Sequence, residues 1–134
     1  MMTQNNRPSF LLEEKLTYKL RGIFIKVNKE YGHLFKESVY QKLCKEGFLN
    51  QGIKFTSQQK IPLYSKSNQV IGFYIPDFII EGKIIIEIKA QNQISDTHVN
   101  QLIRYLKMTK YKIGLLVNFG TPMVQIIRKV YTKH

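Results

Sequence analysis

The chain has 134 residues, 43% of them hydrophobic and 12% aromatic, which predicts one folded domain over residues 1–134 and excludes a disordered chain. Twenty-one Lys and Arg against nine Asp and Glu give a formal charge of +12, which favours a polyanionic partner, nucleic acid ahead of an anionic membrane. No apolar run reaches the roughly 18 residues of a membrane span, and the polar start lacks the apolar core of a signal peptide. We therefore expect a cytoplasmic protein without a membrane partner.

Cysteine and histidine are too few for several classes of site. The single cysteine, Cys44, excludes an internal disulfide and any multi-cysteine metal site, and we interpret it as a small buried apolar residue on a helix. Three scattered histidines do not favour a zinc site. His98 begins a predicted helix, where it would either approach a phosphate or serve as a surface or capping residue.

Two helices are predicted in the first part of the chain. Ser9 is a suitable N-cap, and apolar residues then recur at steps of four and three, which predicts a helix over residues 10–29. A second apolar stripe predicts a helix over residues 35–49. Glu37 lies in the first turn of this second helix, near the edge of its apolar stripe.

From residue 52 the sequence changes to β-branched and aromatic runs separated by turn signals, which predict four strands. These strands are residues 53–55, 59–64, 70–80 and 83–90. A helix capped by Ser95 or Asp96 is predicted over 96–110, followed by a buried strand over 112–119 and a short strand over 123–130. The order favours an α/β or α+β fold, with a mixed sheet and helices packed against it.

Charged residues interrupt the apolar segment 75–89. Because side chains alternate along a strand, Glu87 and Lys89 share one face, while three isoleucines share the other. A strand with one fully apolar face lies inside a protein, where an uncompensated charge costs several kcal/mol. The alternatives to a functional site are a Glu87–Lys89 ion pair and the solvated face of an edge strand.

Asp77 stands ten residues before Glu87 and reaches it through a tight turn. Two adjacent carboxylates repel each other, and a divalent cation relieves the repulsion; their oxygens suit Mg²⁺ or Mn²⁺. A two-residue loop at 81–82 would pair Asp77 with Ile86 and turn the two acids to opposite faces. The site therefore requires a three-residue loop, or a bulge near Pro76.

Three features together resemble a known group of enzymes. Pro76-Asp77, nine residues, and then Glu87-Ile88-Lys89 resemble the signature of the PD-(D/E)XK nuclease superfamily. Glu37 occupies the place where this superfamily often has another acid on a preceding helix. Gln101 and Tyr105, one helical turn apart, resemble the Q-x-x-x-Y motif of its RecB-like branch.

Within that superfamily, the chain most resembles the GxxExxY proteins. The matching segments are 37–40 (E-S-V-Y), 87–90 (E-I-K-A), 98–101 (H-V-N-Q) with Tyr105, and 114–120 (G-L-L-V-N-F-G). At the position of the first glycine in the family name this chain has Leu34, and Gly32 stands two residues earlier. This difference concerns the backbone where a helix begins rather than the catalytic residues. The resemblance implies an α/β restriction-endonuclease-like core, with a mixed central β-sheet flanked by helices, and nuclease activity.

The resemblance also implies roles for individual residues. Asp77 and Glu87 would hold Mg²⁺ or Mn²⁺, with the Ile88 carbonyl as a further ligand and Glu37 contributing directly or through water. The cation would activate water and offset charge on the phosphate during phosphodiester hydrolysis. Lys89 would position that water or stabilise the transition state, since a lysine beside two acids keeps its proton. Gln101 and Tyr105 would orient these groups, unless they form an ordinary polar helix face.

A different class of function remains open at this point. A nucleic-acid-binding or protein-interaction module would keep the fold and charge without turnover, and salt would weaken its binding. The basic residues for such binding cluster around the last helix and the tail: Lys107, Lys110, Lys112, Arg128, Lys129 and Lys133. The intact acid, acid and lysine set favours the nuclease, with DNA as the expected substrate. A domain this small would bind a duplex as a homodimer or through a recruiting protein.

Overall fold

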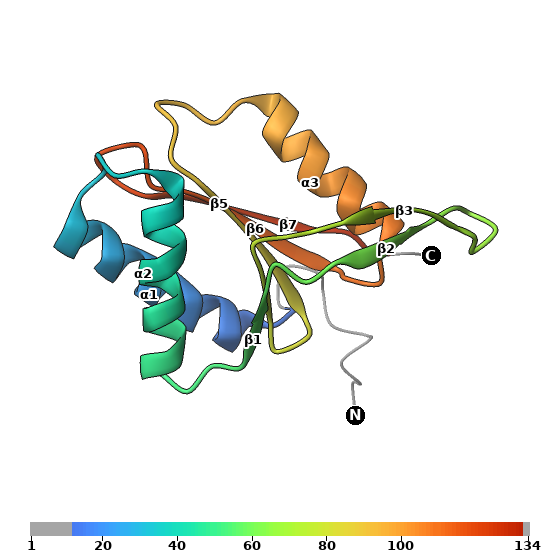
Figure 1. Ribbon diagram of the computed structural model, residues 1–134, viewed down its shortest axis with the longest axis horizontal. Coiled ribbons are helices and arrows are strands. Elements are labelled where there is room, and N and C mark those ends of the chain that lie inside the picture. The colour runs from blue at the N-terminus through green and yellow to red at the C-terminus, as the bar shows by residue number, and fades with distance from the viewer. Residues whose placement is uncertain (1–11, 133–134) are drawn as a thin grey trace.

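The computed structural model describes residues 12–132 (Figure 1). Its helices are α1 (Glu14–Tyr31), α2 (Glu37–Asn50) and α3 (Asp96–Met108). Its strands are β1 (Phe55–Ser57), β2 (Ile61–Tyr64), β3 (Val70–Tyr74), β4 (Phe78–Ile80), β5 (Ile84–Lys89), β6 (Ile113–Asn118) and β7 (Gln125–Val130). Helices and strands follow the predicted order, and most boundaries differ by one to three residues from those expected.

Two predicted boundaries are wrong. Helix α1 begins at Glu14 and not at residue 10, because Glu13 has a left-handed backbone with φ 51°; the proposed cap, Ser9, lies outside the described residues. The single strand predicted over 70–80 is two strands, β3 and β4. Residues 75–77 belong to neither strand, and the chain bends at Asp77 directly after buried Pro76, which cannot donate a hydrogen bond to a neighbouring strand.

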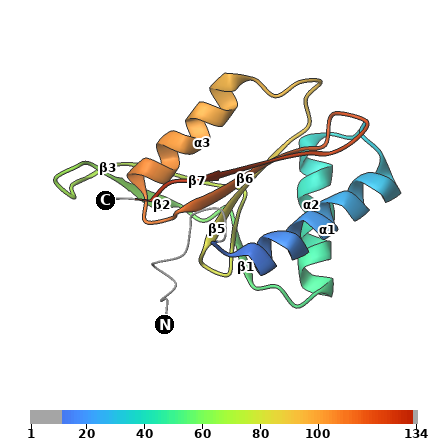
Figure 2. The same cartoon turned by 180° about the vertical axis from the view of Figure 1, so that it is seen from behind.

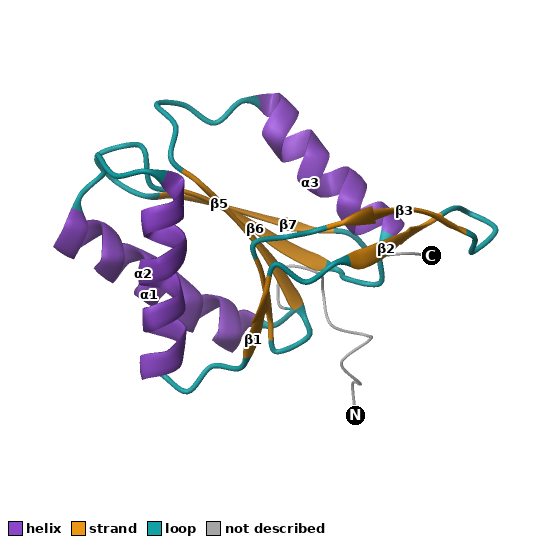
Figure 3. Cartoon of the chain, viewed as in Figure 1, coloured by secondary structure: helices purple, strands orange, loops and turns teal. Residues whose placement is uncertain are grey.

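The main sheet has five strands in the order β1-β4-β5-β6-β7. Strands β5 and β6 are parallel and are connected through α3, whereas the other neighbouring pairs are antiparallel. Strands β2 and β3 form a separate antiparallel pair, visible as a ribbon that projects from the body in Figure 3. The mixed sheet flanked by helices confirms the α/β class, and β5 is an interior strand rather than an edge strand.

Helices cover both faces of the sheet (Figures 1 and 2). Helices α1 and α2 pack on the face that carries Ile84, Ile86 and Ile88. Helix α3 and the β2–β3 pair pack on the face that carries Ile79 and Ile85. The alternation predicted for β5 is therefore confirmed, and Glu87 and Lys89 share the α3 face because they have the same parity as Ile85.

Other predictions concern single residues and elements. Cys44, on α2, is fully buried in the core cluster that the first two helices share with the sheet, as expected for a small apolar residue. All six residues of β6 are buried, as its uninterrupted apolar sequence predicts. Within residues 12–132, none of the helices has the length and apolar character needed to cross a bilayer.

Candidate active site

A tight turn between β4 and β5 determines where the acids lie. Ile80 pairs with Ile84, so residues 81–83 form a three-residue loop. Glu81 and Gly82 have left-handed backbones, with φ 53° and 65°, and the Lys83 N–H donates to the Ile80 carbonyl at 2.8 Å. The three-residue loop that the site requires is confirmed.

This register places Asp77 and Glu87 on the same face. Phe78 pairs with Ile86, so Asp77 arrives opposite Glu87. The Asp77 N–H donates to Glu87 Oε1 at 3.0 Å, and the Ile88 N–H donates to Asp77 Oδ2 at 2.7 Å. These two bonds orient both carboxylates at the point where β4 begins and β5 approaches its end.

Two glutamines contact Asp77 from other elements. Gln41 on α2 donates its side-chain amide to Asp77 Oδ1 at 3.0 Å, and Gln58, just after β1, donates to the same oxygen at 3.4 Å. Neither contact was predicted. Gln41 stands one helical turn after Glu37, so the helix periodicity offered a signal for it, whereas no pattern in the sequence marks Gln58.

Tyr74 closes the site from the side of β3. Its ring stacks on Tyr105 of α3 with centroids 3.7 Å apart and an angle of 15°. Its buried hydroxyl is close enough to Glu87 to affect the carboxylate pKa, but it makes no regular hydrogen bond within the described part of the chain. Burial and the Glu87 carboxylate raise the pKa of Tyr74, so its hydroxyl stays protonated.

Burial leaves the carboxylates short of compensating positive charge. Burial, and after it the neighbouring Asp77 carboxylate, raises the pKa of Glu87 from 4.5 to about 7. Burial also raises the pKa of Asp77, against the lowering effect of the Ile88 N–H, Gln58 and Lys89. The ordinary compensation for two buried acids, a paired cation on each, is thus incomplete here.

Glu37 joins the same electrostatic environment from the first turn of α2. Burial raises its pKa, the Asp77 carboxylate raises it further, and Lys89 and His98 lower it. Its carboxylate therefore lies within electrostatic range of an acid just before β4, a lysine on β5 and a histidine on α3. Helix α2, the β4–β5 hairpin and helix α3 converge here.

Lys89, Gln101 and Tyr105 meet between β5 and α3. Together with Glu87 and His98 they line a small cavity of about 10 Å³. The Gln101 side-chain amide donates to the Tyr105 hydroxyl at 3.3 Å. His98 also caps α3, where its ring nitrogen Nδ1 lies 3.1 Å from the Ser95 hydroxyl, so the capping alternative for this histidine is confirmed.

The two simpler explanations of the charged face are wrong. Among residues 12–132, ion pairs join Lys26 to Glu30 and Lys83 to Glu13, and none joins Glu87 to Lys89. The solvated edge strand is excluded too, because β5 lies between β4 and β6. The six candidate residues are thus gathered around one end of β5, at the junction of both helical layers.

The donor set at this point suits a hard divalent cation. In the described part of the chain, no group of three or more His, Cys, Asp or Glu side chains is already arranged to hold a metal. Mg²⁺, however, commonly takes only one or two carboxylates, with water and other oxygens completing its shell. Asp77 and Glu87 offer such oxygens, and their raised pKa values indicate a deficit of positive charge that a cation would relieve.

Comparison with known proteins identifies the class. The family model described as the PD-(D/E)XK nuclease superfamily matches residues 14–130. The chain therefore belongs to this superfamily, and its five-stranded mixed sheet flanked by helices is consistent with the restriction-endonuclease-like fold. Comparisons with curated proteins and with solved structures gave no significant match.

Proposed function

We propose that the protein is a metal-dependent nuclease that hydrolyses phosphodiester bonds of nucleic acid, with DNA as the first substrate to test. The observation that carries the proposal is the β4–β5 register, which brings the Asp77 and Glu87 carboxylates together beside Lys89. Membership of the nuclease superfamily supports the same reaction class. The net charge of +12 suits a polyanionic substrate.

In this proposal Asp77, Glu87 and the Ile88 carbonyl hold Mg²⁺ or Mn²⁺, and Glu37 contributes directly or through water. When bound, the cation supplies a water of lowered pKa and offsets negative charge on the phosphate. The backbone N–H groups of Asp77 and Ile88 fix the two carboxylates in place. Gln41 keeps the remaining Asp77 oxygen oriented through its amide.

The other residues act on the phosphate and the attacking water. Lys89 places an ammonium group beside the acids, where it stabilises negative charge that develops on the phosphate oxygens. Gln101 and Tyr105, joined by their 3.3 Å hydrogen bond, present an amide and a hydroxyl next to Lys89 and orient the water or the lysine. Stacking of Tyr105 on Tyr74 restricts the position of that hydroxyl.

Assignment to the GxxExxY proteins is part of the proposal. Glu37 would be the acid of that name and Tyr40 its tyrosine. Tyr40 is fully buried, and its hydroxyl donates to the Gly32 carbonyl at 2.7 Å, which supports a structural role at the entrance of α2. Leu34, in place of the first glycine, is 87% exposed. We further propose a cytoplasmic location, and a homodimer or a recruiting protein as the means of binding a duplex.

The experiment is a cleavage assay with purified protein, Mn²⁺ or Mg²⁺, and labelled single-stranded DNA, duplex DNA and RNA. Asp77→Ala and Lys89→Ala are each expected to reduce cleavage by about 100-fold or more, since each removes a charged group from the site. Glu46→Gln changes an exposed acid on the same helix as Glu37 and is the matched control. It should cleave like the wild type.

The same assay distinguishes the main alternative, a non-catalytic module that binds nucleic acid or protein. Salt-dependent binding would occur in both cases, so only turnover separates them. A wild-type protein that cuts none of the three substrates over a range of metal concentrations and pH would refute the enzymatic proposal. Equal cleavage by wild type, Asp77→Ala and Lys89→Ala would refute the assigned site.

A further inference from the structure

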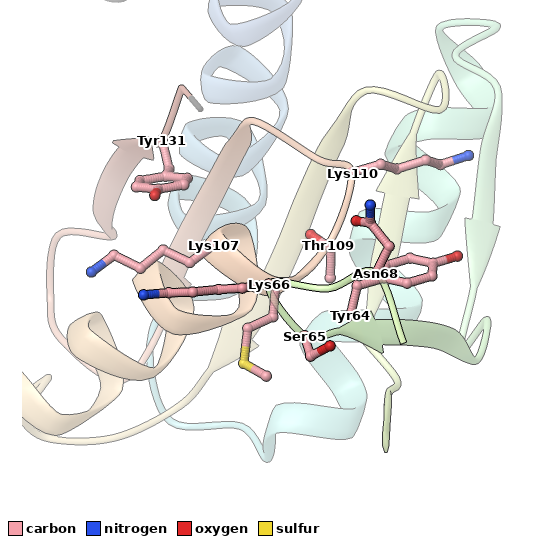
Figure 4. A pocket seen from close by; sticks show the side chains of 9 residues that line it. Tyr64, Ser65, Lys66, Asn68, Lys107, Thr109, Lys110 and Tyr131 are labelled. Atoms are coloured by element: carbon pink, nitrogen blue, oxygen red, sulfur yellow. The ribbon is translucent and has the colours of Figure 1, made fainter. Parts of the chain in front are cut away.

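A cavity of about 790 Å³ lies apart from the acid cluster, between the tip of the β2–β3 hairpin, the C-terminal end of α3 and the residue after β7. Lys66, Lys107, Lys110, Tyr64 and Tyr131 are among the residues that line it (Figure 4). The ammonium groups of Lys66 and Lys107 lie on one side in this view, and that of Lys110 lies on the other. Its volume is in the range of ligand-binding pockets.

The two chain segments that line this cavity contain no Asp or Glu. Residues 47–76 and residues 97–134 include no Asp or Glu, and these two segments supply every residue of the lining. In the described part of the chain, Lys66, Lys107 and Lys110 form no ion pair. Instead, the Lys107 ammonium lies 5.7 Å from the centre of the Tyr131 ring, within cation–π distance. The cavity therefore has a positive potential without an internal counter-charge.

Aromatic side chains distinguish this cavity from a plain basic surface. Tyr64 is 37% exposed and is shared with a second cavity of about 140 Å³, which also includes Lys60 and Tyr111. Lys60 and Tyr64 thus lie just before and at the end of β2, and Lys110, Tyr111 and Lys112 follow one another after α3. This combination binds single strands, whose phosphates contact the cations and whose unpaired bases stack on the rings. A duplex keeps its bases stacked within the helix and would use only the cations.

Helix α3 connects the cavity to the acid cluster. Gln101 is in the first half of the helix and Lys107 in its last turn, six residues later, which corresponds to about 9 Å along the helix axis. That length corresponds to a few nucleotides at most, since even a stacked duplex advances about 3.4 Å per nucleotide. A single strand bound at the cavity would therefore reach the acid cluster within a few nucleotides.

We propose that the cavity binds an unpaired nucleotide of a single-stranded nucleic acid, with phosphates at Lys66, Lys107 and Lys110 and a base against Tyr64. Binding at this place does not require turnover. Its role as an anchor for the strand being cut rests on the proposed nuclease function.

The test measures binding by fluorescence anisotropy in EDTA, with the full chain and a labelled single strand of about ten nucleotides, within the usual site size of such proteins. The triple variant Lys66→Ala/Lys107→Ala/Lys110→Ala removes three exposed cations. Affinity should fall by about 10- to 100-fold near 0.1 M salt, and the slope of log K against log salt should fall by about 2. Tyr64→Leu should weaken binding by about 5- to 100-fold with the slope unchanged.

The matched control removes the same number of charges from the opposite face of the sheet. Lys19→Ala/Lys29→Ala/Lys45→Ala changes exposed lysines on α1 and α2, and its affinity should change by less than about threefold at the same salt. Equal losses in the two triple variants would overturn the proposal, because only net charge would then matter. Equal affinity for a duplex, with no effect of Tyr64→Leu, would also overturn the proposal, because the unpaired bases would then contribute nothing to binding.

Cleavage measured in parallel separates this inference from the proposed function. If the wild type binds through the cavity and cuts nothing, the nuclease proposal fails and the binding site stands. If the wild type cuts and the cavity variant binds and cuts like its control, the binding site fails and the nuclease proposal stands.

Discussion

Replacement of Glu87 by glutamine should stabilise the metal-free protein at neutral and alkaline pH. In the folded state, burial and the Asp77 carboxylate raise the pKa of Glu87 from 4.5 to about 7. A rise of this size corresponds to roughly 3 kcal/mol, at about 1.4 kcal/mol for each pH unit. The Glu87→Gln side chain would keep an oxygen for the Asp77 N–H but would add an amide with no assured partner, so we expect a net gain of about 2 kcal/mol.

The sign of the pH dependence follows from the raised pKa of Glu87. Below about pH 4.5 the carboxyl group is protonated in both the folded and unfolded states, and it does not destabilise the fold. Between about pH 4.5 and 7 the unfolded chain ionises this carboxyl group while the folded protein still holds its proton, so stability decreases across that window and levels off above about pH 7. The advantage of Glu87→Gln should therefore appear between pH 5 and pH 8.

Thermal unfolding in EDTA at these two pH values measures the effect. A net gain of about 2 kcal/mol would raise the Tm of Glu87→Gln by roughly 7 °C over the wild type at pH 8, with little difference at pH 5. Excess Mn²⁺ should raise the Tm of the wild type and not of the variant. Glu46→Gln, on the exposed part of α2, should show neither effect. A variant that is less stable than the wild type at pH 8 would refute the reasoning.

Three further changes test separate parts of the site. Gln41→Ala removes the 3.0 Å hydrogen bond to Asp77 and should lower the affinity for the metal by about 10-fold or more. Calorimetry measures this affinity, and an unchanged value would contradict the role given to the Gln41 amide. Gly120→Ala would place a methyl group against the backbone of Gln91 and should lower the free energy of unfolding by about 1–3 kcal/mol. Urea unfolding measures this change, and an unchanged midpoint would contradict the close packing. Tyr105→Phe keeps the ring, so stability should change by less than about 1 kcal/mol while cleavage decreases; full activity would leave the hydroxyl without a role.

The arrangement of the acids could be predicted from the sequence because the geometry of a strand fixes the direction of each side chain. Side chains alternate along β5, so the position of Glu87 and Lys89 on one face followed from spacing alone. A three-residue loop or a bulge near Pro76 would place Asp77 on that face, and the loop at 81–83 has the required length. The order of helices and strands was accessible for a similar reason, since apolar spacing differs between the two.

Contacts between elements that are distant in the sequence could not be predicted in this way. Gln58 reaches Asp77 because β1 pairs with β4, which places the residue after β1 beside the residue before β4. Tyr74 reaches Glu87 because the chain bends between β3 and β4, so that β3 leaves the main sheet. The prediction of one strand over 70–80 concealed that bend. The pKa of Glu87 depends on how deeply α3 and β3 bury it, and this depth is a property of packing.

The large cavity could not be predicted from the sequence either. Its lysines at 66 and 107 are 41 residues apart in the sequence and become neighbours only when the β2–β3 hairpin packs beside the end of α3. The sequence located the basic residues of α3 and the tail, but nothing in it indicated that the hairpin would supply Lys66 and Tyr64. The absence of acids from both segments was visible from the outset.

Anomalous diffraction from crystals soaked in Mn²⁺ tests the central claim most directly, because it locates the cation and its ligands in one experiment. The account predicts one strong peak in contact with carboxylate oxygens of both Asp77 and Glu87, and its loss in Asp77→Ala. Full occupancy of a different surface site, with no peak between these two acids at saturating Mn²⁺, would contradict it.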